Sequence, residues 1–244
     1  MARSFNGTSQ AIQSQSTVNL SNTATITLSF WLWWNAFAND DELALETSAN
    51  YNSNNGAILI DPNSSTSSAF DVNVHTSNYN SCNFPRPSAA TWHHYGIIAS
   101  TTAQAQVWVD GKSQTVSGGA SPGGNFGNFT LNLMSRNNTT LWGAGRMSDF
   151  AIFNRALSVS EILSLASQQI TPISLDNGAL AVNYKFNEQT PLQDLSQNQN
   201  FGTATGNPVV VDGPPNSQRR RRKFWGSSVA GRAYTFYIAA EKII

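Results

Sequence analysis

Acidic side chains are the first candidates for chemistry, because a glycosidase needs two carboxyl groups that flank the bond it cuts. The sequence has one acidic cluster, Asp40-Asp41-Glu42 followed by Glu46. Such an enzyme would need carboxylates at alternate positions of one strand, whereas Asn39-Asp40-Asp41 is typical of a loop and no Glu-x-Asp-x-Glu pattern occurs. We therefore interpret the cluster as a solvated turn and predict that the protein is not an enzyme.

A second candidate is the segment 119–123, Gly-Ala-Ser-Pro-Gly, which matches the Gly-x-Ser-x-Gly pattern of serine hydrolases. Its context argues against that chemistry, because His75, His93 and His94 all precede the serine, whereas these hydrolases run in the order nucleophile, acid, histidine. We interpret 119–123 as a loop. Neighbouring strand residues face opposite sides, so His93 and His94 cannot both point into one site, and we expect both to be structural.

Metal and redox chemistry find little support in the residue types. A single cysteine, Cys82, excludes an internal disulfide, and no Cys/His cluster has the spacing of metal ligands. Asp40, Asp41 and Asp61 are hard oxygen donors in loop contexts, but the spaced Asp/Asn/Gly pattern of a calcium loop does not occur. We predict no cofactor and leave open a calcium ion alone. The alternative interpretation is that these three aspartates are ordinary surface acids.

Tryptophans are stronger candidates for ligand or interface contact. Trp31 and Trp33 alternate with the apolar residues of 26–34, and Trp108 likewise lies between Val107 and Val109. We expect one or more of these three rings to be partly exposed unless a second layer covers them. Flat indole faces stack on sugar rings and also anchor protein interfaces. The alternative is that Trp31 packs beneath a loop or an added strand.

The elements that must position these residues are mostly strands. Only 11% of the 244 residues are charged, which argues against a helical bundle, while 40% hydrophobic residues suffice for a core. Period-2 alternation predicts strands at 25–34, 56–60, 69–75, 93–99, 103–109 and 129–134, with Asp110-Gly111 as a hairpin turn. One short helix follows the capping box Ser158-Val159-Ser160-Glu161. We predict an all-β, antiparallel two-sheet jelly-roll sandwich with one short helix and a C-terminal extension.

The charge is divided unevenly along the chain. Residues 219–244 hold seven of the fourteen basic residues and one of the fourteen acidic ones, so this end carries +6 and residues 1–218 carry −6. Pro214-Pro215 removes two backbone donors just before it, which interrupts strand pairing. We therefore predict a sandwich over 1–213 and a basic docking arm with a terminal strand over 214–244.

The arm combines charge with apolar side chains. Its basic run is followed at once by two aromatic residues and later by the β-prone segment 234–238. Nucleic-acid binding is an unfavoured interpretation, because the rest of the chain has no basic patch. We expect an assembly contact through Arg219, Arg220, Arg221, Arg222, Lys223, Phe224, Trp225, Tyr234 and Phe236.

Several motifs together resemble a known family. They are 5–10 (FNGTSQ), 26–31 (ITLSFW), 91–94 (TWHH), 107–112 (VWVDGK) and 147–165 (MSDFAIFNRALSVSEILSL). In this order they resemble the laminin-G-like, concanavalin A-like jelly-roll modules. The resemblance implies a two-sheet sandwich that binds sugars or proteins or acts in adhesion, and less often a glycosidase. Residues 178–201 resemble the segment that usually introduces such a module, and we expect them to add a strand or two.

The functional hypothesis combines these observations. The N-terminus lacks the pattern of a signal peptide and no segment is apolar enough to insert into a membrane, so we expect a protein made in the cytoplasm. We predict a non-enzymatic virion structural protein, a phage capsid decoration or fibre-type protein, that displays a lectin-like module on the virion surface. Its partners would be capsid or tail proteins, copies of itself and cell-surface glycans. The alternatives are a carbohydrate-binding or adhesion module of an extracellular, cell-surface protein and, less favoured, a glycoside hydrolase.

Overall fold

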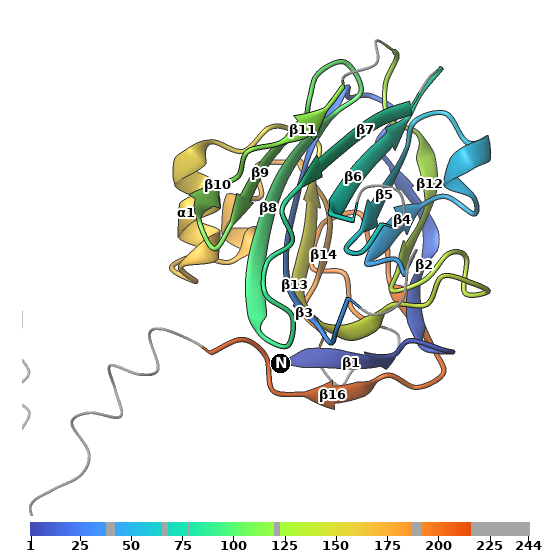
Figure 1. Cartoon of the computed structure of the whole chain (residues 1–244), viewed down its shortest axis with the longest axis vertical. Helices are drawn as coiled ribbons and strands as arrows, with labels where there is room; N and C mark the ends of the chain where they lie inside the picture. The colour runs from blue at the N-terminus through green and yellow to red at the C-terminus, as the bar shows by residue number, and fades with distance from the viewer. Residues whose placement is uncertain (38–41, 65–67, 78, 120–122, 187–191, 216–244) are drawn as a thin grey trace, which may run out of the picture.

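The computed structural model describes residues 1–37, 42–64, 68–77, 79–119, 123–186 and 192–215, which form two antiparallel sheets of eight strands each (Figure 1). The first sheet has the order β10 (Lys112–Ser113), β9 (Gln106–Val109), β8 (Trp92–Ser100), β3 (Thr25–Trp34), β13 (Ala144–Phe153), β1 (Ala2–Asn6) and β16 (Val209–Val211), and β14 (Leu180–Tyr184) also pairs with β13. The second sheet has the order β11 (Ser117–Gly118), β7 (Tyr79–Phe84), β6 (Phe70–His75), β5 (Ala57–Asp61), β4 (Leu45–Thr47), β12 (Asn128–Leu133), β2 (Ala11–Asn19) and β15 (Gly202–Thr205). The predicted all-β jelly-roll sandwich is confirmed.

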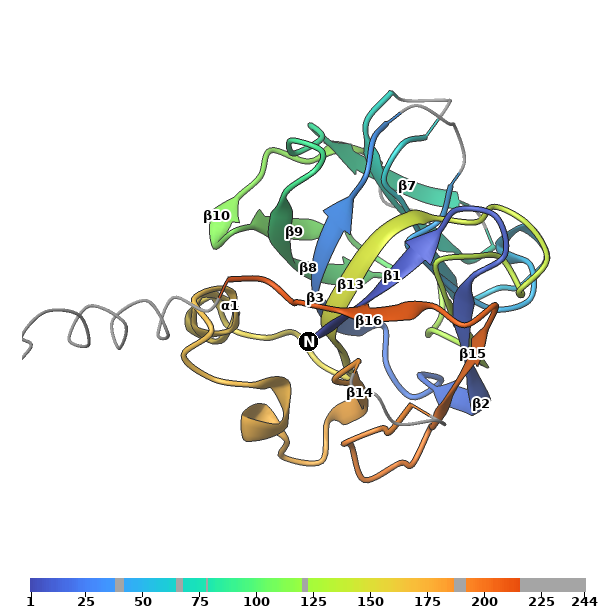
Figure 2. The same ribbon diagram turned by 90° about the horizontal axis from the view of Figure 1, so that it is seen from below.

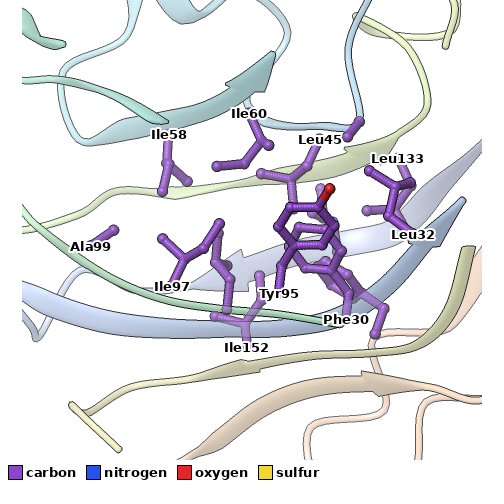
Figure 3. Close-up of a cluster of buried hydrophobic side chains, with 14 of the residues drawn as sticks. Phe30, Leu32, Leu45, Ile58, Ile60, Tyr95, Ile97, Ala99, Leu133 and Ile152 are labelled. Carbon is purple, nitrogen blue, oxygen red and sulfur yellow. The ribbon is translucent and has the colours of Figure 1, made fainter. Parts of the chain in front are cut away.

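The core lies between the inner faces of the two sheets. Alternation in β3 places its apolar set inward, and these side chains meet those of β4 and β5 from the second sheet (Figure 3). A row of aromatic rings crosses the interface: Phe30 stacks on Tyr95 at 5.3 Å between ring centroids, and Tyr95 stacks on Phe70 of the second sheet at 4.9 Å. Offset rings at these separations stabilise a core beyond the area that they bury.

A single α-helix in the described part of the chain covers the outer face of the first sheet. Helix α1 (Val159–Ala166) begins with the predicted capping box, in which the Ser158 side chain accepts from the Glu161 amide and the Glu161 carboxylate accepts from the Ser158 amide. Its apolar side packs on the sheet, and Ile162 lies directly over Gly96 of β8. A Cβ at Gly96 would stand 2.6 Å from Ile162 Cγ2, so this close approach requires glycine.

The predicted hairpin is also present. Asp110 and Gly111 both have positive φ, 51° and 75°, and they join β9 to β10 as the two central residues of a tight turn. Glycine tolerates this conformation at no cost, and aspartate is among the few other residues that adopt it readily. The turn therefore fixes Asp110 beside the end of β8.

Residues beyond the helix complete the first sheet. Within the segment 178–201, β14 pairs with β13, which confirms the expected addition of a strand. The last described strand, β16, pairs with β1, so the N-terminus and the end of the described chain lie side by side (Figure 2). Residues 216–244, which include almost all of the expected docking arm, lie outside the described residues. No helix among the described residues has the length and apolar character needed to span a bilayer.

Candidate functional site

Two of the three candidate tryptophans lie half-buried on the outer face of the first sheet. The Trp31 ring meets the His94 ring edge-on at 5.4 Å and lines a cavity of about 170 Å³, together with Asp149 of β13. Trp33 packs edge-on against Trp92 of β8 at 6.1 Å. On its other side, the Arg146 guanidinium stands 4.8 Å from the centre of the Trp33 ring. Each ring is therefore held by neighbours of its own sheet.

Trp108 occupies a different environment. Only 7% of it is exposed, and it belongs to an apolar cluster with Ile162 and Leu165 of α1. Its assignment as a surface contact is therefore corrected. The physical reason is that α1 forms a second layer over β9 and covers the face to which Trp108 points. The periodicity of the strand indicates that face but not the layer that packs on it.

The two adjacent histidines point to opposite faces, and each is tied to a neighbouring side chain. His94 is buried on the outer face, where its Nε2 lies 3.1 Å from Ser29 Oγ, and burial lowers its pKa to about 4. His93 Nδ1 lies 2.7 Å from Asp110 Oδ2, and this hydrogen bond raises the pKa of His93. Burial opposes ionisation of Asp110, but hydrogen bonds from His93 and from the His94 amide outweigh it and lower the pKa of Asp110. The His93 ring and the His94 amide thus hold the β8 end to the β9–β10 turn, whereas the His94 ring joins β8 to β3 through Ser29.

A polar hollow lies on the outer face of the second sheet. We call this 470 Å³ hollow the β5–β7 groove; its lining residues are Leu43, Tyr51, Asn52, Leu59, Asp61, Ser64, Asp71, Asn73, Ser81, Asn83, Arg136 and Leu141. Its volume falls within the range of ordinary ligand sites. A few leucines give it an apolar floor, and amides, hydroxyls and carboxylates surround them. The groove can therefore offer both dispersion contacts and hydrogen bonds to one ligand.

Strand pairing arranges the side chains of this outer face in three rows that cross β5, β6 and β7. The first row contains His75 and Tyr79, the second Asn73 and Ser81, and the third Asp61, Asp71 and Asn83. Two residues along a strand advance by about 6.6 Å, so the first and third rows lie roughly 13 Å apart. This outer face thus changes from aromatic to amide to acidic along the strand direction.

A cluster of three rings borders one end of the groove, and only Tyr51 among them is a lining residue. We call this cluster the aromatic end of the groove. Tyr79 stacks on His75 at 4.6 Å between ring centroids and with the planes only 14° apart, and Tyr51 lies 5.5 Å from His75 and 5.8 Å from Tyr79. Tyr79 is 52% exposed, whereas Tyr51 is 5% exposed. The Tyr51 hydroxyl has no hydrogen-bond partner among the described residues, and burial raises the pKa of this hydroxyl. This cluster presents an open ring face beside a buried hydroxyl.

A buried ion pair supports the aromatic end from below. Glu46 of β4 is fully buried, and its Oε2 accepts a hydrogen bond of 2.8 Å from Arg136 Nε. Its other oxygen accepts from the Tyr51 backbone amide, which fixes the short turn Tyr51–Ser53 against the sheet. The expected solvated turn is therefore wrong at Glu46, because this carboxylate is enclosed and charge-paired. The same expectation is wrong at Glu42, which is only 8% exposed, while Asp40 and Asp41 lie outside the described residues.

The geometry offers no metal cage in the described part of the chain. No group of three or more histidine, cysteine, aspartate or glutamate side chains is placed there to hold an ion. Asp61, named above as a candidate calcium ligand, is 5% exposed, and its Oδ1 accepts from the Asn63 amide at 2.9 Å. Asp61 therefore serves the floor of the groove and a local turn.

Sequence reasoning missed the β5–β7 groove. One signal was present: Asp71, Asn73 and His75 alternate with apolar residues in one predicted strand, and Tyr79, Ser81 and Asn83 alternate in the next stretch. Polar and aromatic side chains on one face of two neighbouring strands indicate a solvent-exposed face that can bind a ligand. The register between the strands decides which residues lie opposite each other and so forms the rows, and the sequence alone does not indicate that register.

Comparisons with solved structures show the same fold at low identity. A heptameric SAP-like pentraxin from Limulus polyphemus matches with a TM-score of 0.50 and 16% identity over 68% of this chain and 81% of that one. A candidate carbohydrate-binding protein from Bacteroides ovatus matches with a TM-score of 0.58 and 13% identity over 86% of this chain and 61% of that one. Domain 4 of AbnA, a GH43 extracellular arabinanase from Geobacillus stearothermophilus, was solved with arabinotriose. It matches with a TM-score of 0.53 and 16% identity over 68% of this chain and 76% of that one.

The sequence itself gives a family assignment. No curated protein sequence matches this chain significantly. A family model described as the concanavalin A-like lectin/glucanases superfamily matches residues 6–163, which is well over half of the chain and includes most strands of both sheets. The motifs that resemble laminin-G-like modules, the jelly-roll topology and this match agree, so the chain belongs to the concanavalin A-like lectin/glucanases superfamily.

Proposed function

We propose that the protein is a non-enzymatic glycan-binding module and that the β5–β7 groove is its binding site. One observation carries the proposal: an exposed aromatic face at Tyr79 leads into a row of amide and hydroxyl side chains on the same sheet face. Sugar rings have apolar faces that stack on aromatic side chains and hydroxyls at their edges that pair with amides and carboxylates. The order of the rows suits a glycan laid along the strands.

The dimensions of the groove support a short oligosaccharide. The three rows extend over roughly 13 Å along the strands, which is longer than one sugar ring. Asn73 Oδ1 has no hydrogen-bond partner among the described residues and lies in the middle row. A buried acceptor without a partner is costly, so a ligand hydroxyl donated to it contributes binding free energy. The likeness to the Geobacillus domain solved with arabinotriose is consistent with an oligosaccharide of this length.

Glycan binding with chosen variants tests the proposal. The full-length protein would be screened on a glycan array, and hits confirmed by calorimetry for the wild type, Tyr79→Ala, Asn73→Ala and Trp33→Ala. We expect Tyr79→Ala to weaken binding about tenfold, which corresponds to about 1.4 kcal/mol. Trp33 lies on the other sheet and serves as the matched aromatic control. Loss of binding in Trp33→Ala with unchanged binding in Tyr79→Ala would place the site on the first sheet instead.

We also propose that this module is displayed on an assembly through the arm 214–244. The proposal rests on the +6 charge of residues 219–244, the −6 charge of residues 1–218 and the aromatic residues that follow the basic run. Its partners would be capsid or tail proteins or copies of itself, and its location the surface of a virion or, as the alternative, of a cell. Incorporation into particles by wild type and by a chain ending at Ser217 tests it: normal incorporation of the shorter chain would overturn the docking arm.

A further inference from the structure

We infer that the cavity beside Trp31 binds a small organic ammonium ion, a primary amine whose charged nitrogen is held by Asp149, Gln168 and His94. The cavity lies between the outer face of the first sheet and the segment that leads from α1 to the short helix Pro172–Leu175, and we call it the Trp31 cavity. It lies on a different sheet from the β5–β7 groove, and its ligand class goes beyond the proposed function.

A β-bulge turns Asp149 toward this cavity. Strand β13 has one residue more than β3 between Ser148 and Ala151, and Asp149 within this stretch has a φ of 49°. Met147 and Phe150 both lie in the core, so the bulge leaves the two residues between them for the outer face. Regular alternation would have placed the Asp149 carboxylate in the core. Bulges that re-aim a side chain in this way are common beside functional sites.

The Asp149 carboxylate is short of hydrogen-bond donors. Ser148 Oγ lies 2.8 Å from Asp149 Oδ2 and also 2.8 Å from the Met1 carbonyl oxygen, but a hydroxyl has a single proton to donate. Burial raises the pKa of Asp149, and the Ser148 hydrogen bond, the N-terminal amino group and Lys185 offset this only in part. A cationic N–H donor in the cavity would supply a hydrogen bond and a compensating charge together.

Two more buried atoms of the cavity walls have no hydrogen-bond partner in the described part of the chain, Gln168 Oε1 and His94 Nδ1. His94 is 1% exposed, and its pKa of about 4 keeps the ring neutral at neutral pH. With Nε2–H donated to Ser29 Oγ, Nδ1 is left as an acceptor. A primary ammonium has three N–H donors, one each for Asp149, Gln168 and His94. An unpaired buried acceptor is costly, so each of these hydrogen bonds favours binding.

The remaining walls suit a ring-sized apolar body. Trp31 supplies an aromatic ring, to which cations are attracted, and Leu165, Ile170 and Pro172 supply aliphatic surface. The cavity volume of about 170 Å³ is close to the roughly 150 Å³ of an apolar cavity that accepts benzene. No lysine or arginine is found among the described residues that line it, so an anion of the same size would meet no positive charge.

Four benzene derivatives that differ in one group test this assignment by calorimetry on the full-length protein at neutral pH. Benzylamine carries a charge and three N–H donors, benzyltrimethylammonium carries the charge alone, benzyl alcohol has one donor and no charge, and benzoate is an anion. We expect benzylamine to bind about tenfold tighter than the trimethyl compound and the alcohol, and benzoate not to bind.

Nuclear magnetic resonance on the isotope-labelled protein locates the amine. We expect benzylamine to shift the Trp31 indole signal and the His94 ring nitrogens, with His94 Nδ1 unprotonated in the complex. The side-chain amides of Asn73 and Asn83, which line the β5–β7 groove, should stay unchanged. A protonated His94 Nδ1 in the complex would overturn the three-acceptor arrangement.

Variants separate a specific contact from general attraction. Asp149→Asn keeps the side-chain shape, and asparagine also tolerates a positive φ. Gln168→Met removes Oε1 at a similar length. Asp176→Asn is the matched control, because Asp176 follows the helix Pro172–Leu175 but does not line the cavity. We expect Asp149→Asn to weaken benzylamine about tenfold, to the level of benzyl alcohol, Gln168→Met to weaken it about threefold, and Asp176→Asn to leave it unchanged.

Each contrary result has a defined meaning. Equal affinity for benzylamine and benzyl alcohol, or no binding by any of the four compounds, would overturn the ammonium site. Equal losses in Asp149→Asn and Asp176→Asn would show nonspecific attraction to acidic residues and would also overturn it. Shifts at Asn73 and Asn83, with none at Trp31, would move the amine to the β5–β7 groove. These outcomes leave the proposed glycan binding untouched, because glycans test it on the other sheet.

Discussion

The ion pair between Glu46 and Arg136 supports the β5–β7 groove, and a single substitution can remove it. Arg136→Ala leaves the Glu46 carboxylate buried beneath the Tyr51 turn without its cation. Because Glu46 also fixes the Tyr51 amide, the loss should reach both the stability of the sheet and the aromatic end of the groove. We therefore expect a fall in the free energy of unfolding and weaker glycan binding in the same variant.

The magnitude follows from the burial of the two partners. Breaking a buried ion pair by removal of one side costs about 3–5 kcal/mol, because the other charge stays buried and uncompensated. The Glu46 side chain is 0% exposed, but that of Arg136 is 20% exposed, so water can reach the space left by a shortened side chain. Allowing for this solvation, we expect Arg136→Ala to cost about 2–3 kcal/mol. The double variant Arg136→Ala/Glu46→Gln should recover about 1–2 kcal/mol of that loss.

Urea unfolding of the wild type, Arg136→Ala and the double variant measures both changes in the free energy of unfolding. A cost below about 0.5 kcal/mol for Arg136→Ala would refute the buried, charge-paired description of Glu46.

Three further predictions follow from contacts elsewhere in the fold. Because the pKa of His93 is raised in the folded protein, its protonation contributes stability that is complete below the pKa of an unfolded histidine and is lost as the pH rises through the folded value. The melting temperature should therefore fall across that pH range in the wild type and not in Asp110→Asn. Gly96→Ala should lower the free energy of unfolding by about 1–3 kcal/mol in denaturant, because the new Cβ would stand 2.6 Å from Ile162 Cγ2. Adding Ile162→Ala to the same chain should restore part of that loss, and an equal loss with and without Ile162→Ala would contradict the clash. A fragment of residues 1–213 should stay soluble and β-rich by circular dichroism, whereas an insoluble or molten product would contradict the domain boundary, since β16 ends at Val211.

The fold was predictable because its signals are local. The alternation of 25–34 defines β3 with the bounds that the structure shows, and the capping box at Ser158 and Glu161 marks the start of α1. Asp110-Gly111 defines its turn through the backbone preferences of two residues alone. Each of these features depends on neighbours within a few positions, so one stretch of sequence contains all the information.

The site was harder to predict because it is assembled across strands. Asp61, Asn73 and Tyr79 are far enough apart in sequence that only the β5–β6–β7 register brings their rows together. Trp108 shows the converse: its strand periodicity indicates an outward face, but a helix some fifty residues later in the sequence covers that face. Long-range packing, which periodicity does not encode, decides whether an outward aromatic residue meets solvent or a second layer.

Side-chain amide spectra of the protein during a titration with oligosaccharide trimers test the central claim most directly. The β5–β7 groove holds Asn73 and Asn83 on neighbouring strands, and their NH₂ resonances report on ligand at the middle and acidic rows separately. We predict saturable shifts of both resonances together with the ring signals of Tyr79, while the indole signal of Trp33 on the first sheet stays unchanged. Shifts confined to Trp33 and its neighbour Trp92, with none at Asn73, would contradict a binding site on the second sheet.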